Sequence, residues 1–259
     1  MGNDTLRRHM QPYEKEQRFL QNNDTLRRHI QPYLGTLNQK AQLSPFLSPL
    51  QASKKGVCED EDVAKVARFI VNEMKLNKSS LISMEILRYN NIAAKAAAAA
   101  VIVANKVAAY ELWISVVKNN AIWDHKMRIR TVYGEWTCNK KRKEALKFYY
   151  DIWSNIHYGF IGKYVGFSEF ELLQGPGVAQ VKDNNMPMKE VLEKIWKGHS
   201  FRELDHPKDQ TAIKIGFDLY KNHKDGLMSY IIIEKLVDAY LKKEPINIEK
   251  CCLNHQKGF

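Results

Sequence analysis

The sequence predicts a mostly α-helical fold, organised as a single compact domain with a short β-hairpin. Apolar residues recur three and four residues apart in several segments, one long stretch is rich in alanine, and strand-like alternation is rare. A chain of 259 residues is near the upper limit of what one hydrophobic core supports. We therefore expect one domain, residues 58–259, preceded by a poorly ordered N-terminal tail, residues 1–57.

The tail contains a direct repeat. The segment NDTLRRHMQPY at 3–13 returns as NDTLRRHIQPY at 23–33. Two copies are too few for a solenoid, so the repeat is either a duplicated docking segment or a duplication without a role. The stretch that follows, up to residue 57, has prolines, small polar residues and no periodicity, as linkers do.

The first expected helix starts in the acidic run Glu59–Asp62 and continues through VAKVARFIVNEMKLN, whose apolar stripe requires a packing partner. The alanine-rich segment 91–120 follows. It is interrupted by Lys95, Lys106 and Glu111, and each charge costs roughly 2.5–3.5 kcal/mol at the centre of a bilayer. We therefore expect a long buried helix rather than a membrane span.

Helical periodicity continues through the second half of the chain, and we expect helices within 140–156, 186–199, 209–223 and 226–244. Ser168 with Glu171 three positions later has the pattern of a capping box at a helix start. Strand alternation is hard to find except around KMRIRTVYGEW, residues 126–136.

Charge and cysteine content limit the function classes. The formal net charge is +11, so the surface attracts polyanions such as nucleic acid, anionic lipid or acidic wall polymer, although it also favours solubility alone. The four cysteines have neither metal-ligand spacing nor a disulfide framework, which predicts reduced thiols. The first residues lack the apolar stretch of a secretory leader, so we expect synthesis in the cytoplasm and, if the protein leaves the cell, export by another route.

Two polar clusters could carry chemistry. WDHK at 123–126 places Asp124 and Lys126 on either side of an imidazole, although a helix-end tryptophan with exposed charges is the simpler interpretation. In YYDIWSNIHYGFIG, residues 149–162, helical spacing puts Asp151, Asn155 and Tyr158 on one face. His157 lies beside that face and could equally be a hydrogen-bonded core residue.

A third cluster, ELDHPKDQ at 203–210, places Asp205 and Asp209 around a proline just before a helix. Either aspartate could cap that helix. Alternatively, both could bind a divalent metal ion or orient a water molecule.

The order of these motifs resembles the polymorphic toxin type 44 family. The resemblance rests on RFIVNEMKLN, NNAIWDHK, YGEW, YYDIWSNIHYGFIGKYVGFSEFELLQGPGVAQ and DHPKDQTAIKIGFDLY, and it covers roughly residues 61–225. It implies an effector of contact-dependent bacterial competition, which is borne on a secretion-system carrier and neutralised by a cognate immunity protein. Such toxins are usually enzymes. The positions that match the motifs are Trp123, Asp124, Lys126, Asn155, Tyr158, Gly159, Gln180, Asp205, Pro207 and Asp209.

From these matches we expect a catalytic site in which Asp124, Asn155, His157, Asp205 and Asp209 converge. His157 or an aspartate would act as general base, Lys126 would stabilise a developing anion, and Gln180 would position the substrate, with Tyr158 nearby. The activity expected is that of a hydrolase, and the positive charge slightly favours a nuclease that acts on a polyanion. The alternatives are a cell-envelope hydrolase that acts on peptidoglycan or a lipid-linked precursor, and a non-enzymatic membrane-disrupting or binding protein.

Overall fold

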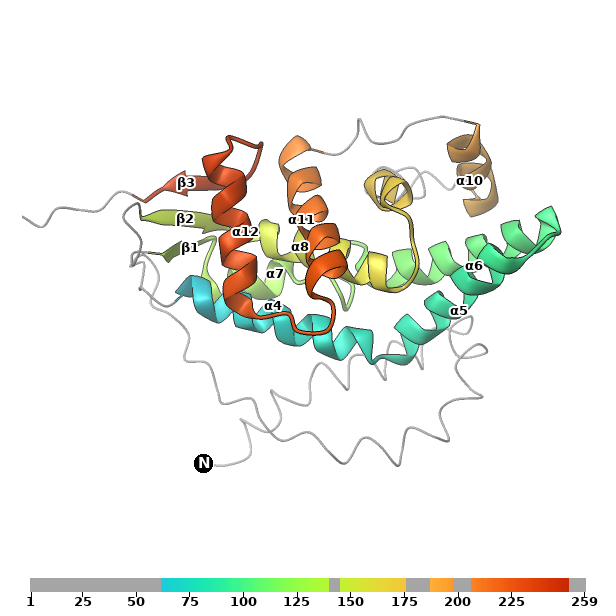
Figure 1. Ribbon diagram of the computed structural model, residues 1–259, viewed down its shortest axis with the longest axis horizontal. Coiled ribbons are helices and arrows are strands. Elements are labelled where there is room, and N and C mark those ends of the chain that lie inside the picture. Colours follow the sequence, from blue (N-terminus) through green and yellow to red (C-terminus); the bar gives the residue numbers. More distant parts are fainter. Residues whose placement is uncertain (1–61, 140–144, 176–186, 198–205, 252–259) are drawn as a thin grey trace, which may run out of the picture.

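The computed structural model describes residues 62–139, 145–175, 187–197 and 206–251, so the predicted tail, 1–57, lies outside the described residues. Helices dominate this part of the chain, which confirms the predicted fold class (Figure 1). In chain order the elements are α4 (Asp62–Lys78), α5 (Leu81–Lys95), α6 (Ala99–Val117), α7 (Lys126–Tyr133), β1 (Trp136–Asn139), β2 (Leu146–Tyr149), α8 (Asp151–Tyr164), α10 (Met188–Trp196), α11 (Pro207–His223), α12 (Ser229–Leu241) and β3 (Ile248–Lys250).

Helix α8 is the central helix of the domain. It is buried on nearly all sides, and α4, α7 and α11 pack against it. Its contact with α11 is very close, because Gly159 faces the backbone of Ile213 and Gly216 faces the carbonyl of Ile156. A side chain at either glycine would separate the two helices, so these glycines fix the distance between the helices that carry the polar clusters.

The three strands form an antiparallel sheet in the order β1-β2-β3, at the opposite end of the molecule from the α5–α6 pair (Figure 1). The inner face of the sheet contributes Leu146, Phe148 and Ile248 to the core. The predicted hairpin is therefore present, but it is made of 136–139 and 146–149.

Two local predictions are wrong. Residues 126–133 form helix α7 rather than a strand, because Ile129 and Tyr133 are the buried residues and they are one helical turn apart. Residues 146–149 form β2 rather than the start of a helix, because burial alternates along them, and helix α8 begins only at Asp151.

Helix α6 is buried only in its C-terminal half, so the prediction of a long buried helix is wrong for the first half. Its buried residues start at Ala109, whereas Val101 is 42% exposed. Among the described residues α6 is the one helix that is long and apolar enough to cross a membrane, judged by length and composition alone, and 33% of its most apolar window is buried.

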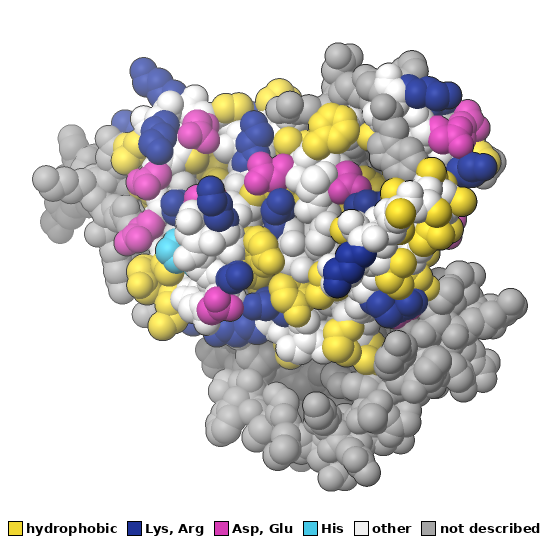
Figure 2. Space-filling model, turned by 45° about the vertical axis from the view of Figure 1, so that its right-hand side comes forward, with side chains coloured by type: hydrophobic (Ala, Val, Ile, Leu, Met, Phe, Trp, Pro, Cys, Tyr) yellow, Lys and Arg dark blue, Asp and Glu magenta, His cyan; other side chains and the backbone are white. Residues whose placement is uncertain are grey.

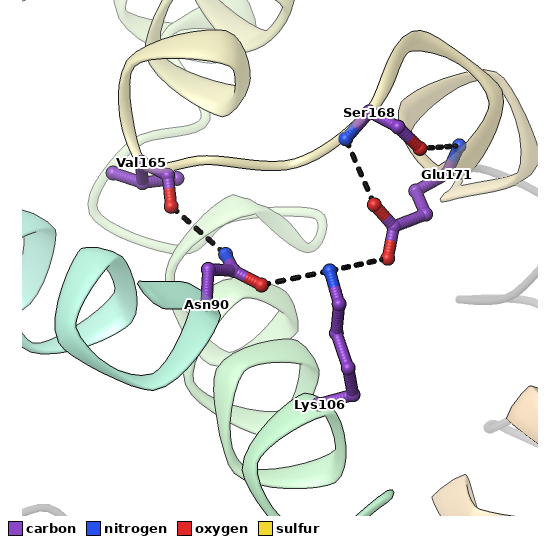
Figure 3. Close-up of polar contacts among 5 residues, drawn as sticks. All are labelled: Asn90, Lys106, Val165, Ser168 and Glu171. Atoms are coloured by element: carbon purple, nitrogen blue, oxygen red, sulfur yellow. Dashed lines mark hydrogen bonds and ion pairs between the residues drawn. The ribbon is translucent and has the colours of Figure 1, made fainter. Parts of the chain in front are cut away.

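A polar network ties α5 and α6 to the chain that follows α8 (Figure 3). Lys106 Nζ donates to Asn90 Oδ1 at 2.9 Å and pairs with Glu171 Oε1 at 2.7 Å. Asn90 Nδ2 in turn donates to the carbonyl of Val165 at 2.8 Å. Glu171 also accepts from the backbone N–H of Ser168, whose hydroxyl accepts from the N–H of Glu171, so the predicted capping box is confirmed.

The prediction of reduced cysteines is wrong at Cys138. This residue is fully buried on β1 and is disulfide-bonded. Its Sγ lies 3.5 Å from the Sγ of Cys251.

Candidate active site

The first turns of α8 and α11 bring together two carboxylates from different parts of the chain. Asn155 Nδ2 donates to Asp209 Oδ1 at 2.9 Å. Asp151 lies one turn before Asn155 on α8, so it occupies the same face. Asp209, which Asn155 bonds, therefore lies on the side of α8 that carries Asp151, and its negative charge raises the pKa of Asp151.

The environment of Asp151 disfavours the charged form of its carboxyl group. Burial raises its pKa above the ordinary value of 3.8, and the negative charge of Asp209 raises it further. The ammonium of Lys126 and a 3.5 Å contact from Asn247 Nδ2 act in the opposite direction. Asp151 Oδ1 is buried and has no hydrogen-bond partner within the described part of the chain.

Asp124 holds the turn that positions Lys126. Its carboxylate accepts from the backbone N–H of Asn120 at 2.9 Å and from that of Lys126 at 3.2 Å. Ser154 on α8 approaches the same carboxylate at 3.4 Å, and its hydroxyl accepts from the N–H of His125. Asp124 therefore fastens the start of α7 to α8, and its oxygens are already engaged.

The structure does not bring His157 to this site. His157 is 1% exposed, and its Nε2 accepts from Asn77 Nδ2 at 2.8 Å. The ring packs edge to face against His125, with 4.4 Å between centroids. Burial lowers the pKa of His157 to about 3, and it lowers the pKa of His125 well below its ordinary value. Both imidazoles are therefore neutral core groups.

The remaining predicted residues lie elsewhere or outside the described ranges. Tyr158 donates to the carbonyl of Leu172 at 3.1 Å and packs against Trp113. Gln180 and Asp205 lie outside the described residues. The N-cap of α11 is His206 rather than an aspartate, with Nδ1 accepting from the N–H of Lys208 at 3.3 Å.

A metal ion at Asp205 and Asp209 stays a prediction. Within 62–139, 145–175, 187–197 and 206–251, no group of three or more His, Cys, Asp or Glu side chains is placed to hold a metal ion. Asp209 with the amide of Asn155 offers oxygen ligands of the kind that hard cations prefer.

Sequence reasoning did not include Asp151 and Asn247 among the site residues. Asp151 stood on the polar face of the predicted helix, but an acid in the first turn of a helix is also expected from the helix dipole. Asn247 comes from the turn before β3, more than ninety residues away, and nothing in its local sequence distinguishes it.

The geometry defines an α-helical domain with a paired-carboxylate site at the starts of two packed helices. Residues 112–222 match the family model described as bacterial toxin 44, which confirms the resemblance to that toxin family over this segment. The matched segment contains Lys126, Asp151, Asn155 and Asp209, and it is shorter than the span of the resemblance read from the motifs. No curated protein and no solved structure matches the chain.

Proposed function

We propose that this toxin is a hydrolase of the bacterial cell envelope that cleaves a glycosidic bond in peptidoglycan or a related glycan. The observation that carries the proposal is the carboxylate pair: Asp151, partly buried with a raised pKa, next to Asp209, which a hydrogen bond from Asn155 holds in place. Glycoside hydrolysis requires one carboxylic acid that donates a proton and one carboxylate on the other side of the bond.

The roles follow from the environments. Asp151 gives its proton to the glycosidic oxygen as the bond from that oxygen to the anomeric carbon breaks. Asp209 takes a proton from a water molecule, whose oxygen forms the new bond to the anomeric carbon. Lys126 stabilises the negative charge that then forms on Asp151, and exchange with solvent returns both groups to their starting states.

The charge distribution on one face of the described residues is compatible with a substrate other than nucleic acid. Figure 2 shows Lys and Arg side chains interspersed with Asp and Glu over one face of the molecule, rather than gathered in one band. A protein that follows a phosphate backbone typically gathers its cations into a basic stripe.

A nuclease is the second candidate, because the whole chain carries a formal charge of +11. In that case Asp209 and Asp205 would bind a divalent cation. A membrane-disrupting protein, which would act through the exposed half of α6, is a third. Delivery by a secretion-system carrier into a target cell and neutralisation by an immunity protein complete the proposal, as expected for a toxin of interbacterial competition.

The test is expression of the full chain with and without an added periplasmic leader, together with Asp151→Asn and Asp209→Asn. We expect killing only from the periplasm, release of reducing ends from purified peptidoglycan, and a loss of at least about 100-fold in each variant. Asp225→Asn, an exposed carboxylate after α11, is the matched control and should remain fully active.

Killing only from the cytoplasm, accompanied by chelator-sensitive degradation of RNA or DNA, would establish the nuclease instead. Leakage of a voltage-sensitive dye that both aspartate variants still cause would favour the membrane-disrupting protein.

A further inference from the structure

The outer face of the sheet carries an aromatic pair. Trp136 on β1 lies directly opposite Tyr149 on β2, and the two rings are 4.9 Å apart between centroids. Side chains alternate between the faces of a strand, so these rings lie on the opposite face from the buried Phe148. Both are partly exposed, unlike the aromatic residues of the core.

A third ring continues the pair towards the carboxylates. Tyr149 and Tyr150 are 4.6 Å apart between ring centroids, and Tyr150 directly precedes Asp151. We call Trp136, Tyr149 and Tyr150 the aromatic row. Its last residue, Tyr150, is the N-cap of α8, whose first residue is the proposed proton donor.

Hydrogen bonds from one segment, the turn before β3, connect the aromatic row to the carboxylate site. The N–H of Tyr149 donates to the carbonyl of Asn247 at 3.1 Å, while the side chain of Asn247 donates to Asp151. The N–H of Tyr150 donates to the carbonyl of Glu135 at 3.0 Å. The row and the carboxylate pair are therefore positioned as one unit.

Among the described residues, charged groups of both signs lie around the row. Lys147 lies over the ring of Trp136 at 4.4 Å and pairs with Glu249 at 2.7 Å. Arg130 lies over the ring of Tyr150 at 5.5 Å, and Glu135 accepts from the hydroxyl of Tyr149 at 3.1 Å. These charged groups of the described residues offer hydrogen-bond donors and acceptors beside the flat rings.

We propose that the aromatic row is a sugar-binding subsite, which stacks against pyranose rings of the glycan next to the bond that is cleaved. The inference rests on the proposed glycan hydrolase. The C–H groups of a pyranose face pack on the electron-rich face of an aromatic ring, and the surrounding charged side chains take the hydroxyl and acetamido groups. The row thereby positions the glycan so that a glycosidic oxygen reaches Asp151.

The test uses the full chain carrying Asp209→Asn, so that the ligand is bound without being cleaved. The probe is the β-1,4-linked tetrasaccharide of N-acetylglucosamine, and its Kd is measured by isothermal titration calorimetry. Adding Trp136→Ala should raise Kd by about tenfold, whereas Trp136→Phe, which keeps a stacking ring, should leave most of the affinity. Tyr230→Ala on α12 removes an aromatic ring that is 58% exposed and is the control.

The outcomes separate this inference from the proposed function. Unchanged affinity in Trp136→Ala would overturn the subsite, even if peptidoglycan cleavage stays dependent on Asp209. A second outcome would overturn both the subsite and the glycan hydrolase: the tetrasaccharide does not bind, whereas a single-stranded oligonucleotide binds and its binding depends on Trp136. Should Trp136→Ala lower the thermal midpoint, the comparison is made with Trp136→Leu, which retains apolar volume.

Discussion

At the scale of single residues, the site depends on unequal environments for two like side chains. Asp151 is partly buried at the start of α8, whereas the carboxylate of Asp209 is fixed by the amide of Asn155. Burial and the neighbouring negative charge both favour the protonated form of Asp151, and Lys126 limits that effect. In the proposed mechanism, Lys126 therefore counteracts the rise in the pKa of the proton donor.

Lys126→Met tests this role. Because Lys126 lowers the pKa of Asp151, its removal should raise that pKa further, and the acid should stay protonated at higher pH. The alkaline limb of the pH–rate profile for glycan cleavage should therefore shift to higher pH, with a lower maximal rate because a stabilising charge is lost. Lys221→Met, about 18 Å along the axis of α11 from Asp209, is the control. A profile that keeps its alkaline limb would exclude Lys126 as the tuning group.

At the scale of elements, the α8–α11 contact decides how close the two carboxylates lie. Both helices have glycine where they cross, so backbone packs directly on backbone. Glycine within a helix normally costs about 1 kcal/mol relative to alanine, and here the close approach offsets that cost.

Gly216→Ala should therefore destabilise the protein, although the same change stabilises most helices. The new Cβ would overlap the carbonyl oxygen of Ile156 and the N–H of Phe160, both backbone atoms that cannot move aside. We expect a loss of about 1–3 kcal/mol in the free energy of unfolding, measured by urea denaturation. Gly226→Ala is the matched control, since its Cβ would meet no atom within 4 Å. Equal stabilities for the two variants would show that the helices can separate without cost.

At the scale of the whole molecule, the buried histidine pair makes global stability depend on pH. The folded pKa values of His125 and His157 lie below the value of 6.5 expected in the unfolded chain, because burial disfavours their charged forms. The unfolded state therefore binds more protons below pH 6.5, and acid favours unfolding. Stability from these groups is fully present above that pH and is lost as pH falls towards about 3, the pKa of folded His157.

The free energy of unfolding should fall as pH decreases below 6.5, by up to about 1.4 kcal/mol per pH unit for each histidine. The thermal midpoint should fall with it. His125→Phe keeps an aromatic ring against Phe69 and removes one titrating group. The thermal midpoint of this variant should therefore depend less steeply on pH. Scanning calorimetry between pH 4 and pH 8 gives both slopes. Identical slopes would mean that His125 does not titrate on unfolding.

Much of this protein was determined by the sequence alone. Its helices follow from apolar spacing, as in α4, α11 and α12, and the capping box of Ser168 and Glu171 follows from a local rule. The resemblance to the bacterial toxin 44 family followed from the order of the motifs. These features depend on residues that are close together in the chain, and local physical rules are sufficient for them.

Only the tertiary structure decided which polar residues meet. It paired Asn155 with Asp209, placed Asn247 beside Asp151, and left His157 in the core with Asn77. It also decided that 146–149 pair as a strand, because the partner strands lie before and far after them in the chain. The physical reason is the same in each case: burial, pKa and strand pairing depend on neighbours supplied by distant segments, which local spacing does not specify.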